Sequence, residues 1–390
     1  MYLFARFNIY SYFCGDKSQP ERMNQKEILH AFCIEGTVSE VKPLGNGLIN
    51  DTFLVTTTEP AAPDYVLQRI NTSIFTDVEM LQRNIERVTE HIRGCGEATL
   101  RFIPTREGRT FHRDAEGNVW RISEYIPHST TLNEVNNVTA YEAGHAFGHF
   151  EQMLSDLTEP LGYTIPNFHN MEYRMEQLRQ AVREDPLQRA QGVSDMLDIF
   201  ERDAARMCQG ERLHREGRLP LRTCHCDTKV NNMLFDDRTG QFLMVIDLDT
   251  VMPSLFFSDY GDFLRTAAST TREDDPQLDN VHFRLDIFKA FTRGYIESVR
   301  TFFTPLEIEL LPWAAELFPF MQSVRFLWAY ILGNDYWKCD YPEHNLDRAR
   351  NQLRLYEEVC RHEEEMANFC RQCYSASNQS PVFTNEKQEL

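Results

Sequence analysis

The periodicity of the hydrophobic residues changes once along the chain, near Pro127. Before this point, segments such as TVSEVKPLGNGLINDTFLVTTT and DYVLQRI carry β-branched residues on both sides of a glycine turn, a pattern typical of strands. After it, apolar residues recur at helical spacing over long stretches. The sequence therefore predicts an α+β fold, with a small β-rich lobe followed by a larger, mostly helical lobe.

The expected domain boundaries follow from this change. Residues 23–127 form the β-rich lobe, with a hairpin at Asp114–Gly117 and one helix, VEMLQRNIERVTEHIRG, that stops at Gly94. The apolar stripe of this helix contains Leu81, Ile85, Val88 and Ile92. The segment QKEILHAFCIEG predicts an earlier helix that ends at Gly36. Residues 128–373 form the helical lobe, residues 1–22 an N-terminal extension, and residues 374–390 a disordered tail.

Charge and composition limit the partners of the protein. The net charge of -19 repels phosphate backbones, so we expect no nucleic-acid partner. Apolar segments are too short or too interrupted to span a membrane, and we expect no membrane association. The 10 cysteines are scattered rather than arranged as a disulfide framework, which favours a reducing compartment, the cytoplasm. We expect a monomer or a weak homodimer.

Residues 225–250 concentrate carboxylate and amide side chains at a fixed spacing. In HCDTKVNNMLFDDRTGQFLMVIDLDT, Asn232 follows Asp227 by five residues, and Asp247 ends an apolar run. Phosphoryl transfer needs a carboxylate that orients the attacking hydroxyl and oxygen ligands that hold Mg²⁺ against the nucleotide phosphates. Asp227 would orient the hydroxyl, and Asn232 and Asp247 would bind Mg²⁺. The alternative is a polar turn with solvated carboxylates, but the β-then-α context favours phosphotransfer.

The chain resembles the aminoglycoside phosphotransferase and choline kinase superfamily, which is related to the protein kinases. Within this superfamily it is most similar to the bacterial N-acetylhexosamine 1-kinases. The resemblance extends over about residues 30–365. It is carried by GNGLINDTF, YVLQRIN, NIERVTEHI, HCDTKVNNMLFD, VIDLDTVMP, DYGDFLR, RFLWAYILGNDYW and HNLDRARNQL.

The resemblance implies a bilobal protein-kinase-like fold with a defined catalytic loop. It makes Asp227 the catalytic base and Asn232 and Asp247 the Mg²⁺ ligands. His225 would support the loop, and Asp259 in SDYGD would hold it in place. The cofactors implied are ATP and Mg²⁺.

The same resemblance implies the nucleotide contacts. Gly45, Gly47 and Asn50 would form the loop over the phosphates, and main-chain groups of Glu124 and Ile126 in SEYIPH would bind adenine. A Walker P-loop is absent, and GNGLIND is not the complete glycine-rich loop of protein kinases.

The third strand, YVLQRI, lacks the phosphate-binding lysine of kinases. Gln68 or Arg69 would replace it, and only one of them faces the nucleotide because side chains alternate along a strand. We favour Arg69 for its charge, with Glu79 or Glu86 as its helical partner. Cys226 occupies a position where relatives often carry Gly or Asn.

The acceptor site is implied by the region near residue 330. Arg325 and Tyr336 match residues that contact the sugar in hexosamine kinases, and Asp249 is a further carboxylate close to the metal or the substrate. The predicted function is ATP-dependent phosphorylation of the anomeric C1 hydroxyl of an N-acetylhexosamine to the sugar 1-phosphate. The alternatives are a related kinase for an aminoglycoside, choline, homoserine or another sugar, and an ATP-binding pseudokinase.

Overall fold

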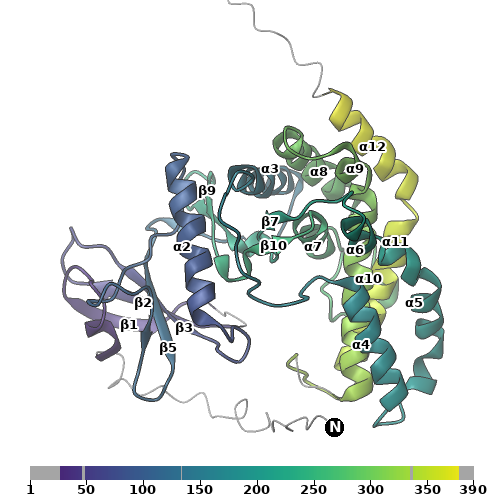
Figure 1. Ribbon diagram of the computed structural model, residues 1–390, viewed down its shortest axis with the longest axis horizontal. Helices are drawn as coiled ribbons and strands as arrows, with labels where there is room; N and C mark the ends of the chain where they lie inside the picture. The colour runs from purple at the N-terminus through teal and green to yellow at the C-terminus, as the bar shows by residue number, and fades with distance from the viewer. Residues whose placement is uncertain (1–26, 46–48, 133, 334–336, 377–390) are drawn as a thin grey trace, which may run out of the picture. The chain divides into compact units, whose positions relative to one another are not determined.

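The computed structural model describes residues 27–45, 49–132, 134–333 and 337–376 (Figure 1). Its contacts divide the chain into two compact units, one of residues 1–73 and 101–126 and one of residues 74–100 and 127–390. The first unit contains an antiparallel sheet and the second is mainly helical, so the predicted α+β fold is confirmed. The predicted boundaries at 23–127 and 128–373 stay predictions, and the extension at 1–22 lies outside the described residues.

The sheet of the first unit has five antiparallel strands in the order β1-β2-β3-β5-β4 (Figure 1). The strands are β1 (Val38–Pro43), β2 (Asp51–Thr57), β3 (Tyr65–Ile70), β4 (His112–Arg113) and β5 (Val119–Glu124). The predicted hairpin is formed by β4 and β5, where Asp114 accepts hydrogen bonds from the backbone of the turn.

The two faces of this sheet differ in character. Phe53, Leu67 and Ile122 form one cross-strand row, and they belong to the hydrophobic core of the unit together with Phe32. The next row is Thr52, Gln68 and Arg121. Because side chains of successive residues point to opposite faces, this second row lies on the face away from the core.

The helix predicted to end at Gly36 is shorter than expected. The described helical backbone covers residues 27–30, and Phe32 already pairs with Thr105 in an isolated β-bridge. Phe32 is completely buried, and the Cys33 amide donates to the Pro104 carbonyl at 2.9 Å. The hydrophobic core therefore draws the chain into an extended path that the local helical pattern does not reveal.

Eleven helices of the described part of the second unit carry most of its core (Figure 1). They are α2 (Val78–Gly94), α3 (Asn137–Met153), α4 (Met171–Glu184), α5 (Ser194–Met207), α6 (Gln209–Arg215), α7 (Phe257–Ala267), α8 (Leu285–Val299), α9 (Pro305–Glu309), α10 (Leu311–Leu332), α11 (His344–Cys360) and α12 (Glu363–Ala376). Helix α10 is apolar on almost all sides, because it packs against α4, α7 and α11. Within the described residues, no helix is both long and apolar enough to cross a bilayer.

Helices α3 and α8 cross at very short range. A Cβ atom on Gly144 would lie 2.0 Å from the Phe291 carbonyl oxygen, and one on Gly294 would lie 2.2 Å from that of Tyr141. These glycines are therefore required by the close contact of two backbones.

Three helical stretches of the second unit are each divided into two helices. The breaks fall at Cys208, at Leu310 and between Cys360 and Glu363. The break at Leu310 has a clear cause, because Pro312 lacks an amide hydrogen and cannot continue α9. Helix α12 reaches Ala376, two residues beyond the predicted start of the tail at residue 374.

Helix α2 has the predicted bounds, and the residues of its predicted apolar stripe are buried. It is grouped with the second unit, and buried Asn84 gives one reason for this. The Asn84 amide donates to the carbonyls of Gly162 (2.8 Å) and Val251 (3.2 Å), and its oxygen accepts the Gly162 amide hydrogen (2.9 Å). The left-handed glycine after the helix is Gly96, two residues beyond Gly94.

Short strands frame the polar stretch at 225–250. Strand β7 (Arg222–Cys224) pairs with β10 (Met252–Ser254), and β8 (Met233–Asp236) pairs with β6 (Ser129–Thr130) and β9 (Phe242–Val245). The loop from 225 to 232 therefore leaves one small sheet and enters another.

Candidate functional site

His225 anchors the start of the loop of residues 225–232 inside the second unit. Its imidazole is fully buried against the rings of Phe147 and Phe150. The Asp227 amide approaches Nδ1 at 3.3 Å, and Nε2 lies 2.9 Å from the Ile246 carbonyl oxygen. Since the amide can only donate to Nδ1, Nε2 is the ring nitrogen that donates to the Ile246 carbonyl. His225 has the supporting position that was predicted.

Helix α7 holds the loop through two carboxylates one turn apart. Asp259 accepts the backbone amide hydrogens of His225 (2.7 Å) and Cys226 (2.6 Å). Asp262 accepts that of Thr228 at 3.2 Å. Burial raises the pKa of Asp259 to about 6, although His225 and these amides favour its ionised form. The loop conformation is therefore held by a helix that lies more than thirty residues away in sequence.

The backbone at Cys226 explains its small side chain. Its φ of 63° is in the left-handed region, which favours Gly and Asn. The side chain is buried with Cys224 and Met252, away from solvent. A cysteine is compatible with this position because its side chain packs in the hydrophobic cluster with Cys224 and Met252.

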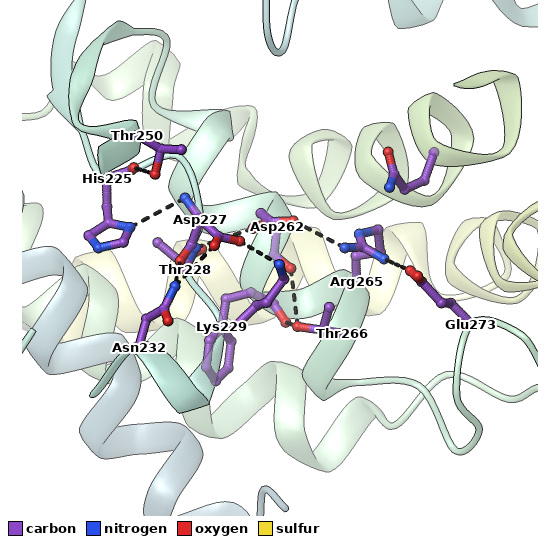
Figure 2. Close-up of polar contacts among 12 residues, drawn as sticks. His225, Asp227, Thr228, Lys229, Asn232, Thr250, Asp262, Arg265, Thr266 and Glu273 are labelled. Atoms are coloured by element: carbon purple, nitrogen blue, oxygen red, sulfur yellow. Dashed lines mark hydrogen bonds and ion pairs between the residues drawn. The ribbon is translucent and has the colours of Figure 1, made fainter. Parts of the chain in front are cut away.

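Asp227 lies between one cation and one amide (Figure 2). Its Oδ1 is 2.7 Å from the Lys229 ammonium, and its Oδ2 accepts a hydrogen bond from Asn232 Nδ2 at 3.1 Å. Burial disfavours the charged form, but Lys229, His225 and Asn232 together outweigh it and the pKa of Asp227 is lowered. The carboxylate is therefore ionised and one-fifth exposed (21%), as a group that accepts a substrate hydrogen bond must be.

Asn232 and Asp247 are brought together by the pairing of β8 with β9. The Ile246 amide donates to the Asn232 carbonyl at 2.9 Å, so Asp247 immediately follows a residue that is bonded to Asn232. Asp247 then turns the chain with φ 60° and ψ 57°, and the residue is exposed.

This pair of residues fits a Mg²⁺ ion. The Asn232 nitrogen donates to Asp227, which directs the amide oxygen away from that residue (Figure 2). Among the described residues, no group of three or more His, Cys, Asp or Glu side chains is arranged to hold a metal. One amide and one carboxylate oxygen are the kind of small ligand set with which Mg²⁺ is bound when phosphates and water complete its shell. Asp249, the further candidate, is buried.

The predicted nucleotide contacts lie in the first unit. Gly45 has a φ of 70° just after β1, and Asn50 accepts the Asn71 amide hydrogen at 3.0 Å. Glu124 ends β5 and pairs with Arg101 at 2.9 Å, and Ile126 is half-buried at the end of the unit. Gly47 lies outside the described residues. These assignments stay predictions.

Arg69 and Gln68 lie on opposite faces of the sheet. Arg69 pairs with Asp51 across β2 and β3, with Nε 2.7 Å from the carboxylate, and its side chain is 46% exposed. Gln68 instead accepts a hydrogen bond from Arg121 Nε at 2.9 Å. The candidate helical partners Glu79 and Glu86 are both exposed.

The acceptor candidate Arg325 is enclosed by aromatic rings. Its guanidinium lies 5.6 Å from the Phe168 ring centre and 5.3 Å from that of Trp337, and it donates to Gln322 at 2.7 Å. Such a cation on a buried helix is held rigidly by its neighbours. The second acceptor candidate, Tyr336, lies outside the described residues.

Two functional candidates were missed from the sequence. Lys229 is in direct contact with Asp227, and Asp262 connects the loop to buried Arg265, which in turn pairs with Glu273 at 2.7 Å (Figure 2). The signals were present: Lys229 stands two residues after Asp227, and Asp262 stands one helical turn after Asp259.

Comparisons with known proteins agree with this geometry. Residues 40–295 match the model of the phosphotransferase enzyme family. The fold is similar to an aminoglycoside phosphotransferase from Alicyclobacillus acidocaldarius (TM-score 0.59, 16% identity, 93% of this chain and 99% of that one). It is also similar to a microcompartment-associated aminopropanol kinase (TM-score 0.55, 15% identity, 89% of this chain and 99% of that one). A third similar structure is an amicoumacin kinase in complex with AMP-PNP and Ca²⁺ (TM-score 0.55, 13% identity, 87% of this chain and 94% of that one).

At these identities the solved structures establish a shared fold, whereas the sequence model establishes the family. It covers more than half of the chain and includes both the sheet of the first unit and the loop that carries Asp227, Asn232 and Asp247. The chain belongs to the phosphotransferase enzyme family.

Proposed function

We propose that this protein is an ATP-dependent kinase that phosphorylates the anomeric C1 hydroxyl of an N-acetylhexosamine. The observation that carries the kinase assignment is the arrangement of Asp227. This carboxylate is ionised, accessible and fixed on both oxygens, and it lies beside Asn232, which is bonded to the residue before Asp247. Family membership supports the same assignment.

The reaction asks for little covalent chemistry from the protein. Asp227 accepts a hydrogen bond from the sugar hydroxyl and takes its proton as the oxygen attacks the γ-phosphorus. A bond forms between the sugar oxygen and phosphorus, the bond between the γ-phosphorus and the bridging oxygen breaks, and ADP leaves. Lys229 keeps Asp227 ionised before the transfer and lies close enough to offset negative charge on the phosphoryl group.

Asn232 and Asp247 would hold Mg²⁺. When bound, the ion supplies positive charge that offsets the negative charge of the nucleotide phosphates. An exposed Asp247 carboxylate suits this role, since it can bind an ion that arrives together with the nucleotide.

The sugar assignment rests on the acceptor candidates and on the resemblance to hexosamine kinases. Arg325 presents a planar guanidinium between Phe168 and Trp337, and this combination suits sugar hydroxyls and an acetamido oxygen. A neighbouring histidine, His169, stacks on Phe168 at 4.3 Å, and its Nδ1 has no hydrogen-bond partner among the described residues.

A second candidate acceptor is a small amino alcohol or an aminoglycoside. The similar structures include kinases named for such substrates. The charge near His169 argues against a cationic acceptor, because burial first and then Arg325, Arg174, Arg265 and Lys229 lower the pKa of His169. Lys229 is paired with Asp227, and Arg265 with Asp262 and Glu273, so the case for a neutral acceptor rests on Arg325 and Arg174.

A coupled assay of ADP formation against a panel of acceptors tests the proposal. The panel contains N-acetylglucosamine, N-acetylgalactosamine, glucose, galactose, choline, aminopropanol and kanamycin. We expect ADP formation to depend on an N-acetylhexosamine, and ³¹P and ¹³C NMR of the product to place the phosphate on C1. Turnover with an amine instead would support the second candidate. ATP binding without turnover on any acceptor would support a pseudokinase.

A further inference from the structure

We propose that His145 and His149, on α3, form together with Glu97 a binding site for a transition-metal ion such as Zn²⁺. The two histidines stand four residues apart, and they are the only such pair among the 12 histidines of the chain. Residues with this spacing lie on the same face of a helix, one turn apart. The inference goes beyond the proposed function, because no step of the kinase reaction uses these residues.

The two imidazoles lie together on the solvent side of α3. Their ring centres are 6.1 Å apart, and the planes of the rings are inclined by 33°. His145 is exposed and the side chain of His149 is 37% exposed, so an ion can reach both from solvent. Elsewhere on the same helix, Phe147 and Phe150 pack against the buried ring of His225. The core therefore fixes the helix, and the histidine pair stays accessible.

Gln152 fixes which nitrogen of His149 is available to a metal. His149 Nδ1 lies 3.3 Å from Gln152 Oε1, and Gln152 Nε2 donates to Thr301 Oγ1 at 3.1 Å. Since an amide oxygen can only accept, Nδ1 donates, and in the neutral imidazole Nε2 then keeps its lone pair. Metal-binding histidines have this arrangement, in which the second ring nitrogen donates to a hydrogen-bond acceptor.

Glu97 faces the Nε2 atom of His149. Its Oε1 lies 3.6 Å from Nε2, which is too far for a hydrogen bond. Nitrogen and oxygen ligands that lie about 2.0–2.2 Å from one tetrahedral ion are about 3.4 Å apart, so an ion fits between these two atoms after a small adjustment. The turn after α2 holds the backbone of Glu97 in place. Gly96 has a φ of 84°, and the Glu97 amide donates to the Ile92 carbonyl at 3.2 Å.

His145 completes the ligand set by turning about its side-chain bonds. The described residues contain no group of three His, Cys, Asp or Glu side chains that already surrounds one point. Two of the proposed ligands face each other, and the third is an exposed side chain, which changes rotamer rapidly. Two imidazoles and one carboxylate, with water as the fourth ligand, are a typical tetrahedral Zn²⁺ set. Imidazole suits transition metals, whereas Mg²⁺ prefers oxygen ligands.

Calorimetric titration of the whole chain with ZnCl₂ tests the site. The titration contains excess Mg²⁺, which competes for oxygen ligands, and no nucleotide. His145→Gln and His149→Gln should each weaken the tightest Zn²⁺ site by about 100-fold, because each removes a ligand. Gln152→Leu should weaken it by about 10-fold, because it removes only the partner that orients His149.

His362→Gln is the matched control in the same unit. His362 Nδ1 lies 3.9 Å from Glu365, and the two side chains are 35% and 51% exposed, against 37% and 54% for the His149 pair. It has no second histidine four residues away, so its replacement should leave Zn²⁺ affinity unchanged. Cys95→Ser removes the exposed thiol two residues before Glu97 and should also have no effect. Circular dichroism in EDTA shows whether each variant is folded.

A crystal grown with Zn²⁺ locates the ion directly. An anomalous difference peak among His145, His149 and Glu97 would support the site. Affinity that stays at the wild-type value in His145→Gln or His149→Gln would overturn the assignment, and so would an equal loss in His362→Gln or Cys95→Ser, because the tightest Zn²⁺ would then lie elsewhere. The titration contains neither ATP nor sugar, so each of these results leaves the kinase proposal unaffected.

Discussion

Replacing Lys229 with methionine separates the charge of this residue from its bulk. Methionine retains an unbranched side chain of similar length but removes the ammonium group that lies 2.7 Å from Asp227 Oδ1. Burial opposes the ionisation of Asp227, but Lys229, together with His225 and Asn232, holds its pKa below the ordinary value. Without the cation, the pKa of Asp227 must rise.

The size of the change follows from the distance. Two unit charges 2.7 Å apart interact by about 1.5 kcal/mol in surroundings as polar as water, by Coulomb's law. The side chains are 21% and 37% exposed, so solvent screening makes this lower limit the appropriate value. Since 1.36 kcal/mol corresponds to one unit, the pKa of Asp227 should rise by about one unit.

The assay is the pH dependence of kcat/KM, which reports ionisations of the free enzyme. Only ionised Asp227 accepts the proton, so a higher pKa moves the acidic limb of the profile to higher pH by about one unit. The maximal rate should fall as well. The pH of the acidic limb is the measurement that decides, because loss of a phosphate contact alone would lower the rate without moving this limb.

A matched control is present in the same unit. Lys289 is 38% exposed and lies 2.6 Å from Glu365, so Lys289→Met removes an equally close ion pair, with an equally exposed lysine, far from the loop in sequence. Its profile should coincide with that of the wild-type protein. An acidic limb of Lys229→Met that stays at the wild-type pH would refute the assignment of Asp227 as the proton acceptor tuned by Lys229.

Three other predictions concern catalysis and stability. Asp227→Asn should lower kcat by about 10²- to 10⁴-fold and leave calorimetric Mg²⁺-ATP affinity largely intact; full activity would contradict the role of this carboxylate. Arg222→Ala removes the guanidinium that donates to both oxygens of the fully buried Glu307, at 2.9 and 2.7 Å. The free energy of unfolding in urea should fall by about 3–5 kcal/mol, because a buried carboxylate loses its partner. The control Arg202→Ala, which breaks an exposed pair, should cost less than about 1 kcal/mol, and equal losses would refute the comparison. Burial raises the pKa of Glu211 to about 7. Between the ordinary pKa of a glutamate and about pH 7, the native state therefore binds more protons than the unfolded state, so the free energy of unfolding should fall as the pH rises through this range. Glu211→Gln should therefore raise Tm at about pH 8 but not at about pH 5; a variant whose Tm differs from wild type equally at both would rule out this ionisation as the cause.

The order of elements and the chemistry of the loop were determined by the sequence alone. Periodicity identified β2, β3 and α2, because strands and helices of ordinary length repeat their apolar residues locally. The spacing of Asp227, Asn232 and Asp247 predicted a shared site. The structure bonds Asn232 to Asp227 and to Ile246, the residue before Asp247, because a short loop and one hairpin keep these segments close.

Where the local pattern was ambiguous, the structure could not be predicted from the sequence, or was predicted incorrectly. The helix before β1 stops early because Phe32 is buried and pairs with a residue far along the chain, which no local pattern records. The choice between Gln68 and Arg69 had the same limitation: alternation places them on opposite faces of the sheet, but only the strand register shows that Gln68 lies on the face away from the core.

Tertiary structure decided which distant residues complete the site. Asp259 and Asp262 reach the loop from α7, over separations of more than thirty residues in each case. Such contacts depend on sheet register and helix packing, which arise only when the whole core is assembled. Sequence spacing can specify a motif within one turn or hairpin, but only the folded chain determines which charge is placed beside it.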